Sequence, residues 1–302
     1  MRAKLNPEKR NWGHCEITER DYQMLRFLWK WKLVSSTALA RRFFFEISPL
    51  SAYRRLQLLE TDGYLKANVF EGRGLEVWGL TDKGFAFILP KLGDLKQRGY
   101  KSENIYHDYL STAFHLGEWL THQPDNSGDI SEQQLRRLPA DAWPDWVPRS
   151  ATHRPDGYSV FIQGQKRVVV AFETELSVKE RSRYEAPVAF YDSEEAIQFV
   201  FWLVQSKVTL NALKKSFEKF QMRAVHKHQF IMLSDFLKNG WQASIADGQL
   251  KGKSLIDVLP RSGVVKPSQW HRRADACVLL DSRRRPVIPE ASATSRNLQK
   301  AD

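Results

Sequence analysis

The sequence is poor in cysteine, with only Cys15 and Cys277 among its 302 residues. Two cysteines this far apart lack the spacing of a cysteine metal site, and a reduced, cytoplasmic environment is the default expectation. Long apolar runs are also missing. The longest, residues 196–204, has the length of one buried strand and is too short to span a membrane. Because the N-terminus is polar and basic, it predicts no signal peptide, and we expect a cytoplasmic protein without a membrane partner.

What the sequence does have is positive charge, with a formal net charge of +11. Residues 1–99 contain 18 basic and 11 acidic side chains, residues 100–260 contain 19 and 20, and residues 261–302 contain 9 and 4. The excess therefore lies at the two ends of the chain. Such a bias favours a polyanionic partner, double-stranded DNA above all, whereas the alternative is a basic surface that is merely solvated.

The first ninety residues follow the order helix, helix, helix, hairpin. Capping residues start the helices, because Thr18 precedes acidic residues and Ser48 precedes a proline, while Gly63 stops the third helix. The expected elements are helices that start at 18, 37 and 49, and strands over 64–70 and 75–80, joined by the turn 71–74. This order is typical of the winged-helix fold.

A winged helix that binds DNA places its third helix in the major groove and the tip of its hairpin against the backbone or the minor groove. The candidate DNA-binding residues are therefore Ser51, Tyr53, Arg54 and Arg55 on the third helix, Arg73 at the hairpin tip, and Arg41 and Arg42 on the second helix. The alternative is that these arginines only solubilise a winged helix that binds another protein. Their agreement with the net charge favours DNA.

The second half of the chain alternates strands and helices. A helix over 104–122 carries Glu118 and two histidines, His107 and His115. The histidines lie two turns apart on roughly one face, so they could face an acidic cluster, and the alternative is a packing or surface role. The elements expected after it are strands over 158–162 and 167–175, a helix over 178–192, a strand over 196–204, a helix over 207–220 and a strand over 229–233. This order predicts a mixed sheet flanked by helices.

The clearest candidate for chemistry is the end of the first hairpin in this half. Asp156 precedes its first strand, and Glu173 and Glu175 end its second strand on one face. Three carboxylates this close repel one another unless a cation or a basic group lies among them. They either bind a metal ion, with Lys179 nearby, or are structural. In the structural alternative Asp156 caps a turn and the glutamates pair with arginines, for which the candidates are Arg154, Arg181 and Arg183.

The order Pro155-Asp156, hairpin, Glu173-x-Glu175 and helix resembles the core of the PD-(D/E)xK nuclease superfamily. That pattern has a lysine where this chain has Glu175, and Lys179 is the nearest substitute. Together with the winged helix, the Tyr-His-Asp-Tyr-Leu sequence at 106–110 and the Arg-Pro-Asp-Gly sequence at 154–157, the order is similar to the replication-relaxation family of plasmids and integrative elements. The resemblance spans roughly residues 16–235.

This resemblance implies an α+β or α/β protein in which a winged helix-turn-helix precedes a mixed-sheet, PD-(D/E)xK nuclease-like α/β domain. The expected segments are a basic leader (1–15), a winged-helix DNA-binding domain (16–90), a linker (91–102), the nuclease-like domain (103–260) and a basic, partly disordered tail (261–302). It also implies a DNA-binding protein of a mobile genetic element that acts in replication, mobilisation or their regulation. Further partners would be other replication or mobilisation proteins, or a second copy of the chain.

Two functions follow for the nuclease-like domain. In the first, the domain serves binding or assembly, because the lysine of the triplet is displaced. In the alternative, the protein is a metal-dependent DNA endonuclease or nickase. Asp156 and Glu173 would then hold Mg²⁺, Glu175 would assist them, and Lys179 would orient the attacking water.

Overall fold

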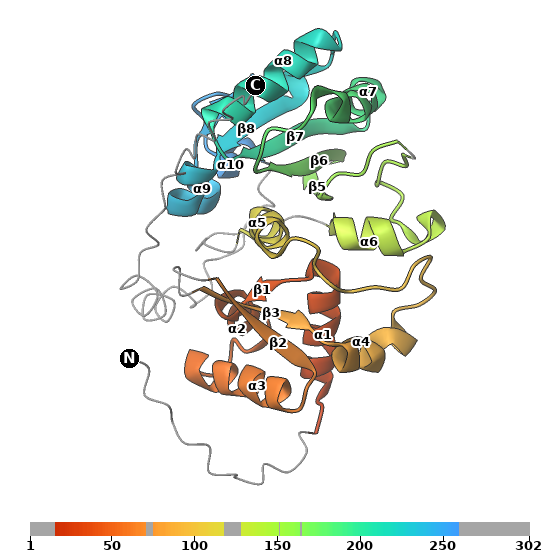
Figure 1. Cartoon of the computed structure of the whole chain (residues 1–302), viewed down its shortest axis with the longest axis vertical. Helices are drawn as coiled ribbons and strands as arrows, with labels where there is room; N and C mark the ends of the chain where they lie inside the picture. The colour runs from red at the N-terminus through yellow and green to blue at the C-terminus, as the bar shows by residue number, and fades with distance from the viewer. Residues whose placement is uncertain (1–15, 71–74, 118–127, 151, 164, 260–302) are drawn as a thin grey trace, which may run out of the picture.

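The computed structural model describes residues 16–70, 75–117, 128–150, 152–163 and 165–259. A small three-stranded sheet with its helices lies at one end of the molecule and a six-stranded sheet lies at the other (Figure 1). Arg73, Glu118, the leader and the tail lie outside the described residues. No helix within the described ranges is long and apolar enough to cross a membrane.

The N-terminal part has a winged-helix-like arrangement, as the sequence predicts. Its sheet has the order β1-β3-β2 and is antiparallel throughout. Its elements are α1 (Glu19–Trp31), β1 (Val34–Ser35), α2 (Ser36–Phe43), α3 (Pro49–Thr61), β2 (Leu65–Phe70), β3 (Leu75–Leu80) and α4 (Asp82–Ile88). Thr18 and Asp21 form a reciprocal capping box at the start of α1. α3 is terminated at Gly63, whose φ of +79° is a left-handed conformation that favours glycine.

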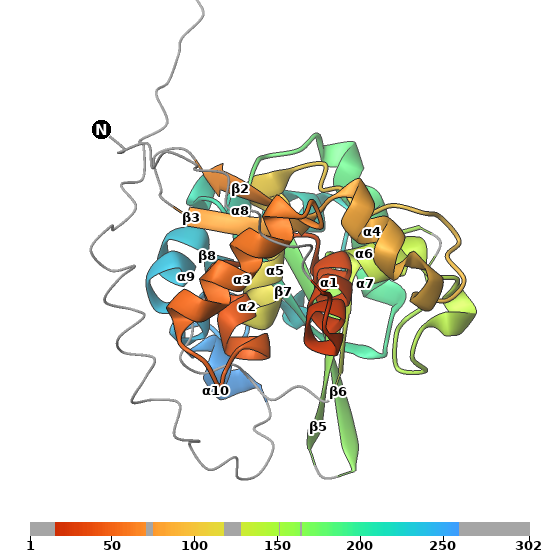
Figure 2. The same cartoon turned by 90° about the horizontal axis from the view of Figure 1, so that it is seen from below.

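The C-terminal part is built on a six-stranded mixed sheet of order β4-β5-β6-β7-β8-β9. Its strands are β4 (Gly128–Ser131), β5 (Gly157–Gln163), β6 (Lys166–Glu175), β7 (Ile197–Val204), β8 (His228–Met232) and β9 (Ile245–Asp247). The first three strands form an antiparallel meander, β6, β7 and β8 run parallel, and β9 returns antiparallel. The β5–β6 hairpin projects beyond the rest of the described chain (Figure 2).

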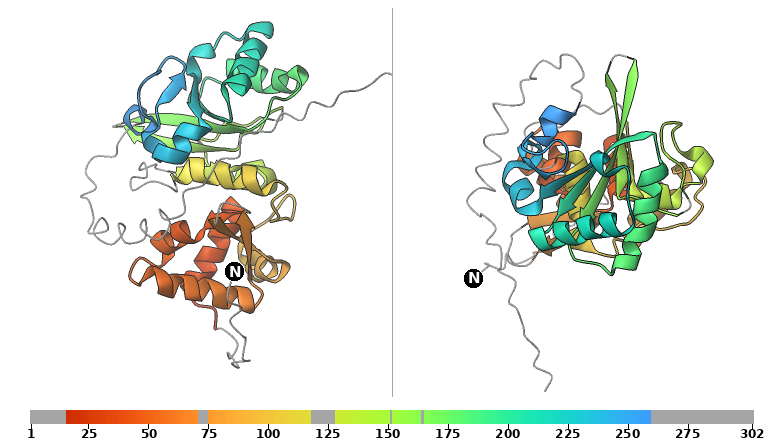
Figure 3. Two further views of the ribbon diagram at one scale, coloured as in Figure 1. Left: turned by 60° about the vertical axis from the view of Figure 1, so that its left-hand side comes forward. Right: turned by 90° about the horizontal axis from the view of Figure 1, so that it is seen from above.

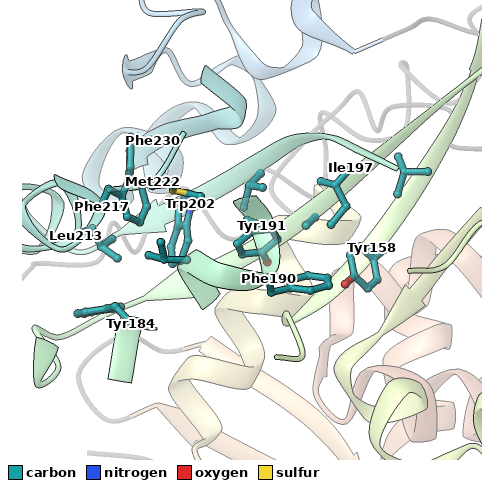
Figure 4. Close-up of a cluster of buried hydrophobic side chains, with 14 of the residues drawn as sticks. Tyr158, Tyr184, Phe190, Tyr191, Ile197, Trp202, Leu213, Phe217, Met222 and Phe230 are labelled. Carbon is teal, nitrogen blue, oxygen red and sulfur yellow. The ribbon is translucent and has the colours of Figure 1, made fainter. Parts of the chain in front are cut away.

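Helices cover both faces of this sheet. One face packs against α5 (Ile105–Leu116), α9 (Leu233–Asn239) and α10 (Leu255–Val258), with Phe114, Phe172 and Phe236 in the shared core. The other face packs against α7 (Glu185–Ser193) and α8 (Lys207–Lys219), where Tyr191, Trp202 and Phe217 are buried (Figure 4).

Two of the expected helices differ from the structure. The helix predicted over 104–122 starts after Asn104 as expected, but α5 ends at Leu116 because Gly117 adopts the left-handed conformation that terminates helices. The segment predicted as one helix over 178–192 begins as a 3-10 helix, η3 (Arg181–Tyr184), and continues as α7. A short helix, α6 (Glu132–Arg137), follows β4.

The segment over 91–102 is packed against both halves of the chain. The carbonyl oxygen of Gly99 accepts hydrogen bonds from Nε1 of Trp29 (3.1 Å) and from Nε2 of Gln133 (2.8 Å). Tyr100 is buried and donates to Asp82 at 2.7 Å. The segment predicted as a linker is therefore hydrogen-bonded both to the winged helix, through Trp29, and to the C-terminal part, through Gln133.

The end of α1 joins the winged helix to the rest of the chain. Nζ of Lys32 lies 2.6 Å from Oε2 of Glu132 on α6 and 3.2 Å from Oδ2 of Asp108 on α5. Thr112 of α5 donates to the carbonyl of Trp31 at 2.8 Å, and Lys30 pairs with Asp129. In the left view of Figure 3, α5 (yellow) lies between the winged helix and the six-stranded sheet. Lys32 itself has a φ of +60° within a γ-turn closed by a 2.7 Å Leu33-to-Trp31 hydrogen bond, a conformation that needs support from its surroundings.

Candidate functional site

The three carboxylates predicted to gather at one end of the β5–β6 hairpin do lie there. Glu173 and Glu175 occupy alternate positions at the end of β6, and the amide of Asp156 donates to the carbonyl of Phe172 at 3.1 Å. Burial raises the pKa of Asp156 to about 6, and the charge of Glu173 adds to this rise while His107 opposes it. The acidic cluster is therefore electrostatically coupled.

Each carboxylate of this cluster already has partners. Oε1 of Glu173 lies 2.6 Å from Nε2 of His153 and accepts from the hydroxyl of Tyr191 at 2.5 Å. Oε2 of Glu175 lies 2.7 Å from Nζ of Lys179. The glutamates thus pair with a histidine and a lysine, whereas the sequence-based structural alternative named Arg154, Arg181 and Arg183, which are all exposed.

Asp156 is fixed by the backbone of β6 and by α5. Its Oδ2 accepts from the amide of Thr174 at 2.7 Å and from the hydroxyl of Ser111 at 3.3 Å. Nε2 of His107 lies 3.7 Å from the same oxygen and 3.0 Å from the carbonyl oxygen of Thr174. On its other side, Nδ1 of His107 lies 3.6 Å from Oδ1 of Asp108.

His107 faces the carboxylates of the acidic cluster, whereas His115 packs among aromatic rings and against the backbone of Asp156 and Gly157. His115 is buried between Phe172 and Trp31, with ring centroids 4.3 Å and 5.1 Å away, and burial lowers its pKa to about 3. The reason is helical geometry: eight residues at 3.6 per turn leave the two side chains roughly 80° apart around α5. Of the two roles expected for His115, the structure shows the packing role.

The stability of the protein should fall as the pH rises from about 6.5 to about 9. Burial alone would lower the pKa of His107, but Asp156 and Asp108 outweigh burial and raise it from 6.5 to about 9. A histidine whose pKa is higher in the folded state stabilises that state below its unfolded pKa and stops doing so above its folded pKa. Urea unfolding at pH 6.5 and pH 9 measures the loss of stability between the two pH values, and this loss should be smaller in His107→Gln than in the parent. An equal loss of stability in the parent and in the variant would contradict the prediction.

The residues of the acidic cluster do not fit a magnesium ion as they stand. No group of three or more His, Cys, Asp or Glu side chains in the described ranges could hold a metal ion. Mg²⁺ requires a near-octahedral shell of oxygen ligands. Asp156 and Glu173, the two predicted ligands, instead contact His107 and His153.

The outer face of α3 forms the candidate nucleic-acid interface. Ala52, Leu56 and Leu59 are fully buried against the winged-helix core, whereas Ser51 and Arg54 are exposed. α3 lies on the side of the winged helix that faces away from the six-stranded sheet (Figure 1). The hydroxyl of Ser51 lies 2.9 Å from that of Ser48, the N-cap of α3.

Two of the predicted DNA-binding residues on α3 are engaged inside the protein. Arg55 donates to both carboxylate oxygens of Asp21, which is completely buried, at 3.1 Å and 2.5 Å, and to the carbonyl of Glu16 at 2.8 Å. The hydroxyl of Tyr53 donates to Glu76 of β3 at 2.9 Å. The guanidinium of Arg55 therefore points at α1, and its predicted role in DNA binding stays a prediction. Tyr53 is half-buried and ties α3 to the hairpin.

The predicted arginines of α2 differ in exposure. Arg42 is exposed, and its guanidinium lies 4.6 Å from the centre of the Phe27 ring, whereas Arg41 is half-buried. The winged helix itself carries little excess charge, with 11 basic and 9 acidic side chains over 16–90. Most of the excess at this end of the chain comes from 1–15, with 4 basic against 1 acidic side chain, and from 91–99, with 3 against 1.

Sequence reasoning missed several residues of the acidic cluster. His153, Tyr191 and Ser111 all contact it, and they come from a loop, from α7 and from α5. Only His153 lies near the Pro-Asp motif in sequence. The other two are brought in by helix packing across the sheet, for which the sequence has no local signal.

Comparisons with known proteins give a partial likeness for the N-terminal region. No family model matches the sequence, and no curated protein matches it. Three structures of mutant ZitR from Lactococcus lactis are 17–19% identical, cover 24–38% of this chain and 55–69% of theirs, and have TM-scores of 0.21–0.22. This chain spans only 55% and 64% of the first two of them. At these TM-scores the likeness carries no argument, so the winged-helix-like assignment rests on the element order and sheet order of the chain itself.

Proposed function

We propose that the chain binds double-stranded DNA through the outer face of α3. The exposure of that face carries the proposal, because no other described part of the chain covers the helix that a winged helix inserts into the major groove. Arg54 projects from its middle, and the basic segments 1–15 and 91–99 flank the winged helix in sequence. Such segments would contribute phosphate contacts, which supply sequence-independent affinity.

We further propose that the second domain serves binding or assembly in a protein of a mobile genetic element, as the similarity to the replication-relaxation family implies. Support comes from the order of α5, the β5–β6 hairpin, the Glu173-x-Glu175 triplet and a following helix. The partners of its carboxylates favour a role without DNA cleavage. Lys179 forms an ion pair with Glu175, and histidines contact the two predicted metal ligands, Asp156 and Glu173. Double-stranded DNA, replication or mobilisation proteins and a second copy are the partners proposed.

Replacing Arg54 by glutamate should weaken binding of the full chain to duplex DNA roughly tenfold or more, since one base contact of this kind contributes about 1–3 kcal/mol. Fluorescence anisotropy with a labelled duplex measures the change, at two salt concentrations because phosphate contacts make affinity salt-dependent. The matched control is Lys215→Glu, the same charge reversal at an exposed position of α8. Equal weakening by both variants would indicate a general charge effect and would refute α3 as the reader.

Arg55 is unsuitable for this test although it is adjacent to Arg54. Its substitution would strand the buried carboxylate of Asp21, so lost binding would report lost folding. Arg54 has an exposed side chain, and its substitution leaves the buried face of α3 intact.

A further inference from the structure

Exposed apolar side chains gather at the start of α3 and in the turn before it. We call Phe45, Ile47 and Leu50 the apolar patch, and their side chains are 53%, 38% and 58% exposed. Single exposed apolar residues are ordinary on a protein surface. Here, however, three of the ten large apolar side chains that are exposed in the described part of the chain lie within six residues. This concentration calls for a binding partner.

Leu50 belongs to the same helix face as Arg54. It is the second residue of α3, and the exposed Ser51 and Arg54 follow it. Residues four apart are neighbours on a helix surface, so the side chains of Leu50 and Arg54 lie side by side on the outer face. Side chains of a helix point back toward its N-terminus, so Leu50 covers the surface beyond the first turn. The face that the proposed function places in the major groove therefore begins with an apolar group.

The major groove has one apolar feature, the C5-methyl group of thymine, beside the hydrogen-bonding groups of the bases. A guanidinium such as that of Arg54 suits the O6 and N7 atoms of guanine, whereas an apolar side chain suits the thymine methyl. Contacts to the charged phosphates require basic or polar groups, and Leu50 provides neither. Leu50 is therefore suited to a base pair that contains thymine and unsuited to the DNA backbone.

A second copy of the chain fits the apolar patch less well. Stable protein interfaces bury about 800 Å² on each partner and involve roughly 20–30 residues a side. The apolar patch consists of three side chains, and the exposed polar residues Glu46 and Ser48 lie between them in sequence. A patch this small is of the size that contacts one or two base pairs.

We propose that Leu50 contacts the methyl group of thymine in the major groove, and that α3 therefore prefers a site with an A·T pair close to the base that Arg54 contacts. This inference rests on the proposed function, duplex binding through α3, and adds a sequence preference to it. Four residues rise about 6 Å along a helix, and successive base pairs are about 3.4 Å apart. The A·T pair should therefore lie about two base pairs from the contact of Arg54.

The test starts by selecting, with the parent full chain, bound sequences from a random pool of DNA duplexes. The enriched duplex is then made with thymine or with uracil, which lacks only the methyl group, at each A·T pair. One of these exchanges should weaken binding about fourfold or more, the effect of losing one buried methyl group. Fluorescence anisotropy measures the ratio of the two affinities. The ratio should be the same at two salt concentrations, because the methyl group carries no charge.

Leu50→Ala should bind the thymine and uracil duplexes equally well, and Val208→Ala is the matched control. Val208 is likewise the second residue of a 13-residue helix that follows a serine N-cap, and its side chain is 70% exposed. This control should keep the preference of the parent for thymine. Leu50→Met should keep it as well, because methionine retains an apolar side chain at the same position.

Three results would overturn the proposal. The selection could enrich no A·T pair near the contact of Arg54. The loss caused by uracil could persist in Leu50→Ala, which would indicate that the shape of the duplex is recognised. Without DNA, Leu50→Ala could melt earlier than the parent or change its oligomeric state, which would show that the chain or a second copy covers the apolar patch.

Failure of this inference is distinguishable from failure of the proposed function. If Arg54→Glu weakens binding and Lys215→Glu does not, α3 binds DNA, and a missing thymine effect then refutes the role of Leu50 alone. If the parent binds no duplex, or if the two charge reversals weaken binding equally, the proposed function fails and this inference fails with it.

Discussion

Replacing Lys32 by methionine should lower the free energy of unfolding by about 3 kcal/mol, because a buried charge pair that loses one partner leaves the other uncompensated. The ammonium of Lys32 is bonded to two carboxylates, and its side chain is only 9% exposed. Burial alone would lower the pKa of Lys32, but Asp108 and Glu132 outweigh burial and raise it. Methionine keeps most of the apolar stem, so the loss should be mainly electrostatic.

Urea unfolding of the full chain measures this effect, and Lys101→Met is the matched control. Lys101 also pairs with an aspartate, Asp82, but the two side chains are 72% and 85% exposed and 3.6 Å apart. An ion pair this exposed contributes little to stability, so the control should unfold at nearly the same urea concentration as the parent. If the two variants unfold alike, the buried lysine does not hold α1 to α5 and α6.

Replacing Arg55 by alanine should also destabilise the protein, by about 3 kcal/mol, for the same physical reason at the other end of α1. Asp21 is completely buried, and Arg55 donates to both of its oxygens. Burial alone would raise the pKa of Asp21, yet the hydrogen bonds from Arg55 and Thr18 outweigh it and hold the pKa below 3.8. A carboxylate of this kind stabilises the folded state above its unfolded pKa and ceases to do so as the pH falls through its folded pKa.

The neighbouring substitution Arg54→Ala is the control for this prediction. It removes an arginine from the same helix but from the exposed face, so circular dichroism melts should show almost no change. Arg55→Ala should melt earlier, and its deficit should narrow as the pH falls below 3.8, where the carboxylate of Asp21 loses its charge. Equal melting of the two variants at neutral pH would count against a structural role for Arg55.

The winged-helix elements were predictable because their signals are local. Thr18, Ser48 and Gly63 act at helix ends through bonds to residues a few positions away, and the structure places them there. The structural role of Arg55 could also be predicted from the helical spacing of the buried residues of α3. It follows Ala52 by three residues and precedes Leu59 by four, so it belongs to the buried stripe of α3, while Arg54 does not.

The acidic cluster shows what local signals cannot determine. Alternation along β6 placed Glu173 and Glu175 on one face, and hairpin pairing brought Asp156 beside them. Their partners come from elements that are far apart in sequence, since Tyr191 belongs to α7 and His107 to α5. Whether a carboxylate faces a metal ion or a histidine is decided by the packing of these helices on the sheet, and the sequence pattern is the same in both cases.

The contacts of Gly99 on both sides of the chain have a geometric consequence. Because this segment is hydrogen-bonded to both Trp29 and Gln133, it does not act as a flexible hinge between the winged helix and the six-stranded sheet. The ion pair of Lys32 with Glu132 restrains the same junction. A copy of the protein seated on a duplex by α3 would hold its six-stranded sheet at one azimuth around the DNA axis. Because B-DNA turns once in about 10–10.5 base pairs, the spacing between two neighbouring sites would determine whether the sheets of two copies face each other or point to opposite sides.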